Sequence, residues 1–195
     1  MKKQRFAITG GIGSGKSTVL RAINDFGYPT FSCDSIYREL LTEKGYLEKL
    51  SLLFPAVFEN GSLSKEKLSK LVFSSKENLN KLNALAHPLI MERLYAEMEK
   101  HKISFAEVPL LFEGGYEKDF DKIIVVVRPK NERIEAVVER DKKSKETVLE
   151  TLKSQFNYET DLSSKISENV FVLKNENSKE ELVKSLKNLL NEYIL

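Results

Sequence analysis

The sequence predicts an α/β fold built around a parallel sheet, and three observations support this prediction. Short apolar runs, which indicate buried strands, alternate with longer segments in which apolar residues recur at helical spacing. The first apolar run leads directly into a glycine-rich loop, Gly10–Thr18, with the spacing G-x-x-x-x-G-K-[ST]. A helical pattern and a second apolar run then follow, and a strand, a helix and a strand in this order form a parallel βαβ unit.

The composition limits the class of protein. The 195 residues suit one domain with an insertion, and 31 basic and 29 acidic residues give a net charge of +2, which does not indicate nucleic acid as a partner. The single cysteine, Cys33, excludes an internal disulfide and a cysteine metal cluster. No apolar run approaches the ~20 residues of a membrane helix, and no signal peptide precedes the first strand. We therefore expect a cytoplasmic protein that does not contact a membrane.

The first βαβ unit brings two features to one edge of the sheet. The sequence predicts a strand at 6–9, a helix at 16–26 that Gly27 ends, and a second strand at 29–31. Ligands of parallel sheets bind beyond the carboxyl ends of the strands. Asp34, just after the second strand, is therefore expected at the same edge as the glycine-rich loop.

The middle of the chain is predicted to be mostly helical. From residue 35 to about 101 apolar residues recur at helical spacing, with breaks at Pro55, Asn60-Gly61 and His87-Pro88. This is too much helix for one crossover connection. We expect part of it to form a helical subdomain inserted beside the glycine-rich loop.

The second half of the chain returns to the sheet. Strands are predicted at 103–108, 122–127 and 170–173, with a helix from about 131 to 141 after the second of them. Ser178-Lys-Glu-Glu181 is a capping box that begins the last helix. We assign a single domain, 1–195, with a core at 1–34, 102–141 and 170–195, an insertion at about 35–101 and a lid at about 142–169.

The loop Gly10–Thr18 has the features of a phosphate-binding loop. Its glycines let consecutive N–H groups point into one concave site, and the following helix adds unpaired N–H groups and the positive end of its dipole. Lys16 can reach the β- and γ-phosphates of a nucleotide, the Ser17 hydroxyl can ligate Mg²⁺, and the hydroxyl or N–H of Thr18 can hold the α-phosphate. The alternative is a glycine-rich turn that caps a helix and binds nothing. The predicted nucleotide-binding residues of the loop are Gly11, Gly13, Ser14, Gly15, Lys16, Ser17 and Thr18.

Phosphoryl transfer also needs an oriented nucleophile and positive charge on the transferred group. A carboxylate is suited to orient or deprotonate a hydroxyl, and Asp34 is the best-placed candidate; its alternative role is to cap a helix beginning at Ser35. Arg140 is the best candidate for an arginine finger, because it lies where a core helix gives way to the lid. Its alternative role is a surface ion pair with Asp141 or Glu139.

Further residues are candidates with less support. Arg133 and Arg128 are weaker arginine candidates of the same kind. Glu107 and Glu113 flank a proline at the functional edge of the sheet, where either can hold Mg²⁺ through water or bind substrate; helix capping is an equal alternative for Glu113. His87, which precedes a proline, is more often a structural cap than a catalytic base.

With these residues identified, the chain resembles dephospho-coenzyme A kinases from about Phe6 to the last helix. The phosphate loop alone fits many kinases, whereas the His-Pro-Leu-Ile and Pro-Leu-Leu-Phe-Glu segments in this order are more specific. The resemblance rests on Thr9–Thr18, Asp34, Ala86-His-Pro-Leu-Ile90, Glu107-Val-Pro-Leu-Leu-Phe-Glu113, Arg140-Asp141 and Phe171-Val-Leu-Lys-Asn175.

The resemblance implies a P-loop NTPase three-layer fold with a five-stranded parallel sheet, a helical substrate-binding insertion and a lid. It implies Mg²⁺-assisted transfer of the ATP γ-phosphate to the ribose 3′-hydroxyl of dephospho-CoA, the last step of coenzyme A synthesis. We expect a monomer or a weak homo-oligomer. Asp34 would be the base, Lys16 and Arg140 would act on the phosphates, and Asn175 would lie near the adenine. The implied substrate-binding residues are Asp34, His87, Pro109, Leu110 and Glu113.

Two segments depart from the family's pattern. The family usually has two aspartates around a small residue where this chain has Ser32-Cys33-Asp34, so the first carboxylate is missing. The lid keeps Gln155, but residues 156–169 lack most of the family's basic and Ala-Asp pattern.

Two alternative functions remain open. Another small-molecule or nucleotide kinase on the same fold would share every residue of the loop and differ only in its acceptor pocket. A P-loop GTPase-like switch, or a binding module regulated by nucleotide, belongs to a different class. The sequence argues against this second alternative, because it contains no Asp-x-x-Gly, and Asn80-Lys-Leu-Asn83 lacks the aspartate of the guanine-reading Asn-Lys-x-Asp.

Overall fold

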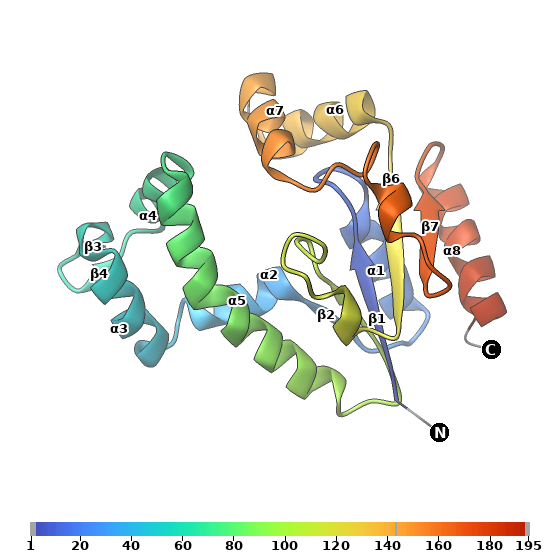
Figure 1. Cartoon of the computed structure of the whole chain (residues 1–195), viewed down its shortest axis with the longest axis horizontal. Coiled ribbons are helices and arrows are strands. Elements are labelled where there is room, and N and C mark those ends of the chain that lie inside the picture. Colours follow the sequence, from blue (N-terminus) through green and yellow to red (C-terminus); the bar gives the residue numbers. More distant parts are fainter. Residues whose placement is uncertain (1–2, 143, 194–195) are drawn as a thin grey trace. The chain divides into compact units, whose positions relative to one another are not determined.

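The computed structural model describes residues 3–142 and 144–193, and these contain a five-stranded parallel sheet with helices around it (Figure 1). The strand order is β2-β5-β1-β6-β7. The predicted α/β class is therefore confirmed. The strands are β1 (Gln4–Thr9), β2 (Thr30–Ser32), β5 (Ile103–Glu107), β6 (Lys122–Val127) and β7 (Val170–Lys174).

The strand β1 lies in the centre of the sheet and fixes the register of its neighbours. Ile8 is opposite Glu107 on β5, and Thr9 is opposite Val125 on β6. Both pairings are parallel, so the carboxyl ends of these strands lie at one edge of the sheet. The loop that follows Thr9 therefore begins at the edge where ligands of parallel sheets bind.

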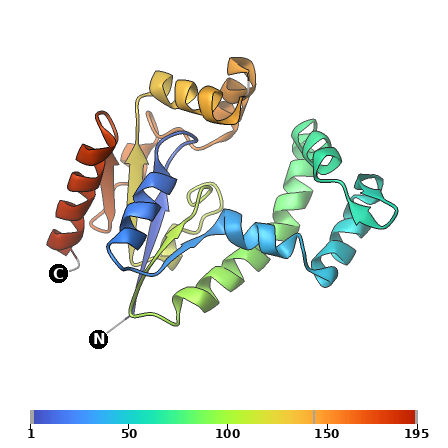
Figure 2. The same cartoon turned by 180° about the vertical axis from the view of Figure 1, so that it is seen from behind.

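Helices α1 (Lys16–Asp25) and α8 (Lys179–Tyr193) cover one face of the sheet (Figures 1 and 2). Their apolar residues meet those of the strands in one buried cluster, whose removal from water stabilises the position of α1. The cluster consists of Phe6, Ile8, Val19, Ala22, Ile23, Phe105, Ile124, Val126, Leu173, Leu182, Leu186 and Leu190.

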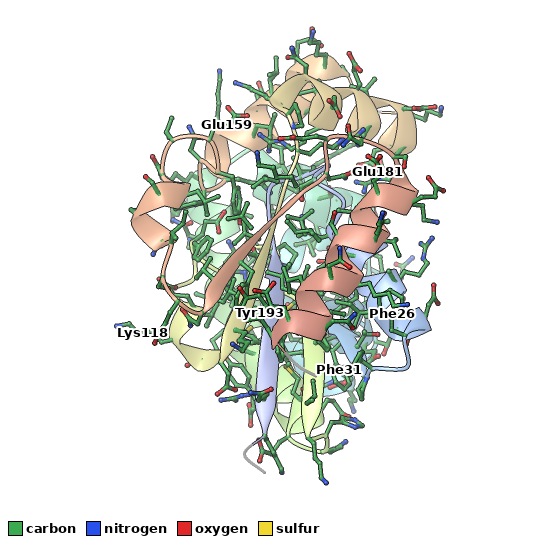
Figure 3. All side chains as sticks on the ribbon, turned by 90° about the vertical axis from the view of Figure 1, so that its right-hand side faces the viewer. Phe26, Phe31, Lys118, Glu159, Glu181 and Tyr193 are labelled. Carbon is green, nitrogen blue, oxygen red and sulfur yellow. The ribbon has the colours of Figure 1, made fainter. Side chains whose placement is uncertain are left out.

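The start of α8 is fixed by a cap. The Ser178 hydroxyl accepts a hydrogen bond from the N–H of Glu181 at 3.2 Å, which confirms this half of the predicted capping box. Figure 3 shows Glu181 and Tyr193 near opposite ends of the helix. The ring of Tyr193 packs against Phe171 on β7, with 4.2 Å between centroids, so both ends of α8 are tied to the protein.

Helices α6 (Lys130–Asp141) and α7 (Lys145–Ser154) pack against each other after β6. A small cluster of Ile134, Val137 and Val148 holds them together, and Ile12 of the glycine-rich loop packs against it. The short helices η2 (Glu117–Asp119) and η3 (Leu162–Lys165) lie in the connections that follow β5 and α7.

The chain divides into two compact units, Met1–Phe31 with Met98–Leu195, and Ser32–Glu97. The second unit is mostly helical. Its elements are α2 (Cys33–Leu40), α3 (Lys44–Leu53), η1 (Pro55–Val57), β3 (Phe58–Glu59), β4 (Ser62–Leu63), α4 (Lys65–Phe73) and most of α5 (Lys76–Met98).

The second unit corrects one expectation and confirms another predicted break in the helical pattern. His87-Pro88 does not interrupt the helix, because Pro88 lies inside the continuous helix α5. Asn60-Gly61 is the turn of a small antiparallel hairpin between β3 and β4, and both residues have positive φ (49° and 78°). An Asn-Gly pair favours this turn because both positions tolerate the left-handed conformation.

Among the residues that the structure describes, no helix combines the length and the apolar character needed to cross a membrane.

Candidate functional site

The loop Gly10–Thr18, called the phosphate loop below, has a backbone that only glycine permits at several positions. Gly13 and Gly15 have φ of 76° and 105°, in the left-handed region that side chains disfavour. A Cβ on Gly13 would lie 2.5 Å from the carbonyl oxygen of Arg133, and one on Gly15 would lie 2.5 Å from Nδ2 of Asn175. The loop is thus packed closely by α6 on one side and by the residue after β7 on another.

Lys16 begins α1 and lies under the loop. Its side chain is buried, and its ammonium group donates to the carbonyl oxygens of Gly10 (2.9 Å) and Gly11 (3.1 Å). The first turn of α1 contains no acidic residue. The N-terminus of α1 therefore combines helix N–H groups, a positive dipole end and a lysine, which together favour an anion.

Ser17 meets a buried carboxylate from the neighbouring strand. Its hydroxyl donates to Oε1 of Glu107 at 3.2 Å, and Glu107 is the last residue of β5. Hydroxyl and carboxylate oxygens are the ligands that Mg²⁺ prefers. Ser17 and Glu107 are therefore residues that can hold a magnesium ion.

Thr18 offers one of its two predicted groups. Its N–H donates to the carbonyl oxygen of Gly15 at 3.0 Å, as part of the first turn of α1. The hydroxyl is therefore the group of Thr18 that suits a phosphate oxygen in this arrangement.

A segment after α7, Gln155–Glu159, crosses the phosphate loop and is called the closing segment below. Oε1 of Gln155 accepts from the N–H of Ile12 at 2.9 Å, and the hydroxyls of Tyr158 and Thr9 lie 3.0 Å apart. These contacts join residues more than 140 positions apart in the chain. The closing segment thus contacts Thr9, which directly precedes the phosphate loop, and Ile12 within the loop.

Tyr158 remains a neutral phenol at physiological pH. Burial raises its pKa to about 12, and the charge of Glu113 adds to this increase. The hydrogen bond with Thr9 acts in the opposite direction. The phenol therefore contributes a hydrogen bond and a buried ring to the site, without a change of charge.

Glu113 lies in the turn after β5 and contacts the closing segment. Its Oε1 accepts from the N–H of Phe156 at 2.7 Å, and the rings of Phe156 and Phe112 lie 4.9 Å apart. This contact differs from the predicted alternative of a helix cap. Pro109 and Leu110 precede Glu113 in the same connection, where the carbonyl oxygen of Leu110 accepts from the N–H of Gly114 at 2.9 Å.

The arginine candidates occupy different environments. Arg140, at the end of α6, is exposed and pairs with Asp141, with 2.6 Å between the closest atoms. Arg128 pairs with Glu132.

Arg133 is buried, and its terminal nitrogen donates to Glu159 at 3.0 Å. It lies against the phosphate loop, because a Cβ on Gly11 would be 2.2 Å from its Nη1.

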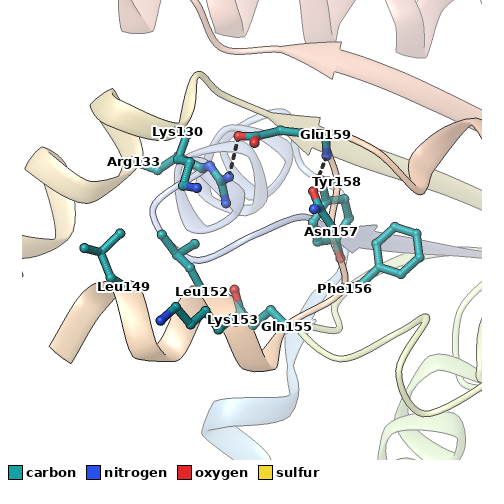
Figure 4. Close-up of a pocket in the computed structure, with 10 residues that line it drawn as sticks. All are labelled: Lys130, Arg133, Leu149, Leu152, Lys153, Gln155, Phe156, Asn157, Tyr158 and Glu159. Carbon is teal, nitrogen blue, oxygen red and sulfur yellow. Dashed lines mark hydrogen bonds and ion pairs between the residues drawn. The ribbon is translucent and has the colours of Figure 1, made fainter. Parts of the chain in front are cut away.

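A cavity of about 200 Å³ opens between α6, α7 and the closing segment (Figure 4). In Figure 4, Arg133 extends from α6 toward Glu159 on one side of the cavity. The apolar side chains of α7 lie on the other side of the cavity. The lining residues are Lys130, Arg133, Leu149, Leu152, Lys153, Gln155, Phe156, Asn157, Tyr158 and Glu159.

Asn175 contacts the loop directly. Its Nδ2 donates to the carbonyl oxygen of Ser14 at 2.8 Å, and its backbone N–H donates to Val127 at 2.8 Å. The side chain therefore braces the phosphate loop, and its predicted position near the adenine remains a prediction.

Two candidates lie in the second unit. Asp34 is exposed in the first turn of α2, which begins at Cys33 rather than at Ser35, so the alternative role of Asp34 as the cap is wrong. The N-cap position belongs to Ser32. His87 lies half-buried within α5, and burial lowers its pKa.

The structure thus gathers Lys16, Ser17, Glu107 and Asn175 around one loop. Sequence reasoning missed the roles of Thr9, Tyr158 and Glu159. Gln155, which matches the family's pattern, is the one residue of this segment that the sequence analysis singles out. No local pattern marks a tyrosine or a glutamate for a contact with a residue 26 to 149 positions away.

These features define the class of protein. A parallel sheet whose central strand leads into a glycine-rich loop, a buried lysine and a helix N-terminus is the arrangement of P-loop nucleotide-binding proteins. A gluconokinase from Sinorhizobium meliloti has a similar fold, with a TM-score of 0.55 and 12% identity over 97% of each chain.

The chain belongs to the dephospho-CoA kinase family, a family of ATP-dependent kinases, because the family model described as Dephospho-CoA kinase matches residues 5–181. Relatives with that name are 36% identical in Thermus thermophilus (95% of this chain, 89% of the relative) and 33% identical in Fusobacterium nucleatum (92% and 93%). Among solved structures, TT1252 from Thermus thermophilus has a TM-score of 0.84 with 34% identity over all of both chains. The dephospho-CoA kinase from Campylobacter jejuni has a TM-score of 0.69 with 28% identity over 97% of this chain and 96% of that one.

Proposed function

We propose that this protein transfers the γ-phosphate of ATP to the ribose 3′-hydroxyl of dephospho-CoA to give coenzyme A. The phosphate loop carries the proposal, because Lys16 and Ser17 begin a helix beside the buried carboxylate of Glu107 in a chain of the dephospho-CoA kinase family. The relatives named dephospho-CoA kinase align over most of this chain, which supports the same acceptor here.

The phosphate loop binds the nucleotide in this proposal. Lys16 exchanges its bonds to the carbonyls of Gly10 and Gly11 for phosphate oxygens, and the N–H groups of the loop hold the β-phosphate. Ser17, with Glu107 through water, would hold Mg²⁺, which neutralises charge on the β- and γ-phosphates. Asn175 braces the loop from the side where we place the adenine.

The acceptor hydroxyl is oriented by Asp34 in this proposal. Asp34 follows β2 by two residues, and ligands of parallel α/β sheets bind beyond the carboxyl ends of strands. Its exposed carboxylate accepts the proton of the 3′-hydroxyl as the hydroxyl attacks in line. The family's first carboxylate is missing at Ser32, and this mechanism assigns its role to no other side chain.

The remaining parts bind and enclose the acceptor. We assign dephospho-CoA binding to the insertion at about 35–101, with His87, and to the connection that carries Pro109, Leu110 and Glu113. The lid at about 142–169 excludes water from the transferred group, and Arg140 stabilises its charge. We further propose that the protein acts in the cytoplasm as a monomer or weak homo-oligomer.

The deciding experiment is a measurement of ADP release with Mg·ATP and a panel of acceptors: dephospho-CoA, adenosine, nucleoside monophosphates and shikimate. We expect strong turnover with dephospho-CoA alone, and a product that supports a CoA-dependent enzyme, which only the 3′-phosphorylated compound does. Turnover of another acceptor, with none of dephospho-CoA, would reject the proposed substrate and leave the kinase class in place.

The role of Asp34 is tested by Asp34→Asn. Loss of the general base should lower kcat by about 10²- to 10⁴-fold and leave the affinity for Mg·ATP nearly unchanged. Glu39→Gln, at another exposed carboxylate of α2, is the matched control and should keep wild-type turnover. Wild-type kcat in Asp34→Asn would remove Asp34 from the base role.

A further inference from the structure

Arg133 is a buried cation that the mechanism above does not use. Its side chain is 8% exposed, so α6 holds a full positive charge inside the protein. One terminal nitrogen donates to Glu159, and Nε has no hydrogen-bond partner among the residues that the structure describes. Burying an incompletely bonded charge is costly, so such a group needs an explanation.

The guanidinium lies against the phosphate loop. A Cβ on Gly11 would be 2.2 Å from Nη1 and 3.6 Å from the ring of Tyr158, so the glycine leaves the space that the arginine occupies. Arg133, Gly11 and Ser14 are among the residues that line a small cavity of about 30 Å³. The Ser14 hydroxyl that borders it is also buried without a partner within the described part of the chain. Two residues that each carry an unsatisfied buried polar atom therefore border the same cavity where the loop approaches α6.

The surroundings of Arg133 carry an excess of positive charge. Lys130, Arg133 and Lys153 line the larger cavity of Figure 4, and Glu159 is the only acid among its lining residues within the described ranges. Three cations facing one carboxylate attract an anion. The carboxylate side chain is 47% exposed, so it can turn into solvent when another anion takes its place.

We propose that Arg133 binds the polyphosphate chain of the nucleotide held on the phosphate loop, and that Glu159 holds the guanidinium in place until the nucleotide arrives. The planar guanidinium suits two phosphate oxygens at once, and this contact satisfies the nitrogen that the protein leaves unpaired. The inference rests on the proposed function only in taking the phosphate loop as the nucleotide site.

The test compares two variants whose effects on Mg·ATP affinity have opposite signs, measured by calorimetric titration without any acceptor. Arg133→Gln removes the charge and keeps a shorter polar side chain, and it should weaken binding by about 10- to 100-fold. Glu159→Gln frees the guanidinium for phosphate, and it should tighten binding severalfold. Arg21→Gln, at an exposed arginine of α1, is the control and should bind as the wild type does.

The thermal midpoint of each variant without nucleotide separates stability from binding. Both variants should lower it, because each removes one partner of the ion pair that the buried Arg133 makes with Glu159. If the pair serves structure alone, both variants change Mg·ATP affinity in the same direction or leave it unchanged, and either result overturns the proposal. If Arg133→Gln fails to fold, Glu159→Gln decides alone, since unchanged or weaker binding in that variant is equally decisive. Since no acceptor is present, failure of the dephospho-CoA assay is a separate result.

Discussion

At the scale of single residues, the site depends on which groups fit beside the phosphate loop. Lys16, Glu107 and Arg133 are charged residues held in the interior at one edge of the sheet. Each lies beside loop backbone or a loop side chain, so the loop and these charges form one structure. Substitutions here should therefore alter nucleotide binding together with stability.

Gly13→Ala tests the packing of the loop against α6. The new Cβ would lie 2.5 Å from the Arg133 carbonyl oxygen and 2.9 Å from Val137, in addition to the cost of a positive φ. We expect a loss of unfolding free energy well above the ~1–2 kcal/mol of left-handed strain alone, together with loss of Mg·ATP binding.

Gly115→Ala is the matched control for Gly13→Ala. Gly115 has a similar φ of 71°, and a Cβ there would meet no atom within 4 Å. Urea unfolding and ATP titration compare the two variants. Equal destabilisation would show that the contact with α6 is unimportant.

His87 should give the protein a pH-dependent stability. Burial lowers its pKa below the ordinary value of 6.5, so the folded state binds a proton less readily than the unfolded state. The contribution of neutral His87 to the free energy of unfolding is complete above pH 6.5. It is lost as the pH falls through the lowered pKa. His87→Gln should therefore show a smaller fall in thermal midpoint between pH 7.5 and about 5.5 than the wild type.

His101→Gln leaves His87 in place and serves as the control for this measurement. It should keep the pH-dependent fall that His87 causes. An undiminished fall in His87→Gln would contradict the assignment to this residue.

At the scale of elements, α5 shows packing prevailing over local preference. A proline inside a helix costs about 3 kcal/mol relative to alanine, because it removes one hydrogen bond and crowds the preceding turn. The helix nevertheless continues through Pro88, since apolar residues on both sides of it are buried. These residues are Leu82, Ala86, Ile90, Met91 and Leu94.

Pro88→Ala should therefore stabilise the protein. The side chain is exposed, so the substitution restores a hydrogen bond without opening a cavity. We expect about 1–3 kcal/mol of added unfolding free energy, measured by urea denaturation. Glu92→Ala, at an exposed position of the same helix, should change stability by less than about 0.5 kcal/mol. A destabilised Pro88→Ala variant would mean that the proline fixes a conformation that the fold requires.

At the scale of the whole molecule, the function that we propose places the nucleotide on one compact unit, and Asp34 with part of the acceptor site on the other. The unit made of Met1–Phe31 and Met98–Leu195 contains the phosphate loop and the closing segment. The unit Ser32–Glu97 contains Asp34 and His87. Binding of a nucleotide and binding of an acceptor should therefore protect different backbone amides from hydrogen exchange.

Hydrogen exchange tests this division of work. Mg·ATP should slow exchange of the amides at 10–18 and 155–159, and leave those of the β3–β4 hairpin unchanged. Dephospho-CoA should then slow exchange within the insertion at about 35–101. Lys16→Met keeps the length of the side chain without its charge and should remove the effect of Mg·ATP. Equal protection of both units by Mg·ATP alone would contradict the division.

Local sequence patterns predict many of the helices and strands and the phosphate loop. Apolar periodicity, Gly27 and the Ser178 capping box predicted α1, β6, α6 and α8 almost to their ends, because such signals act within a few residues. The spacing from Gly10 to Ser17 predicted the phosphate loop, because its shape is a local property of glycine backbone. The order of further segments indicated the family to which the chain belongs.

Contacts between residues far apart in the chain could not be predicted from local patterns, because they depend on the packing of whole elements. Gln155 and Ile12, Tyr158 and Thr9, and Glu159 and Arg133 approach through packing of α6 and α7 on the loop, which no local pattern encodes. The same applies to the start of α2 before Asp34 and to the continuity of α5 through Pro88. In each case burial of apolar surface from several elements outweighs the preference of a few neighbouring residues, and that sum exists only in the folded chain.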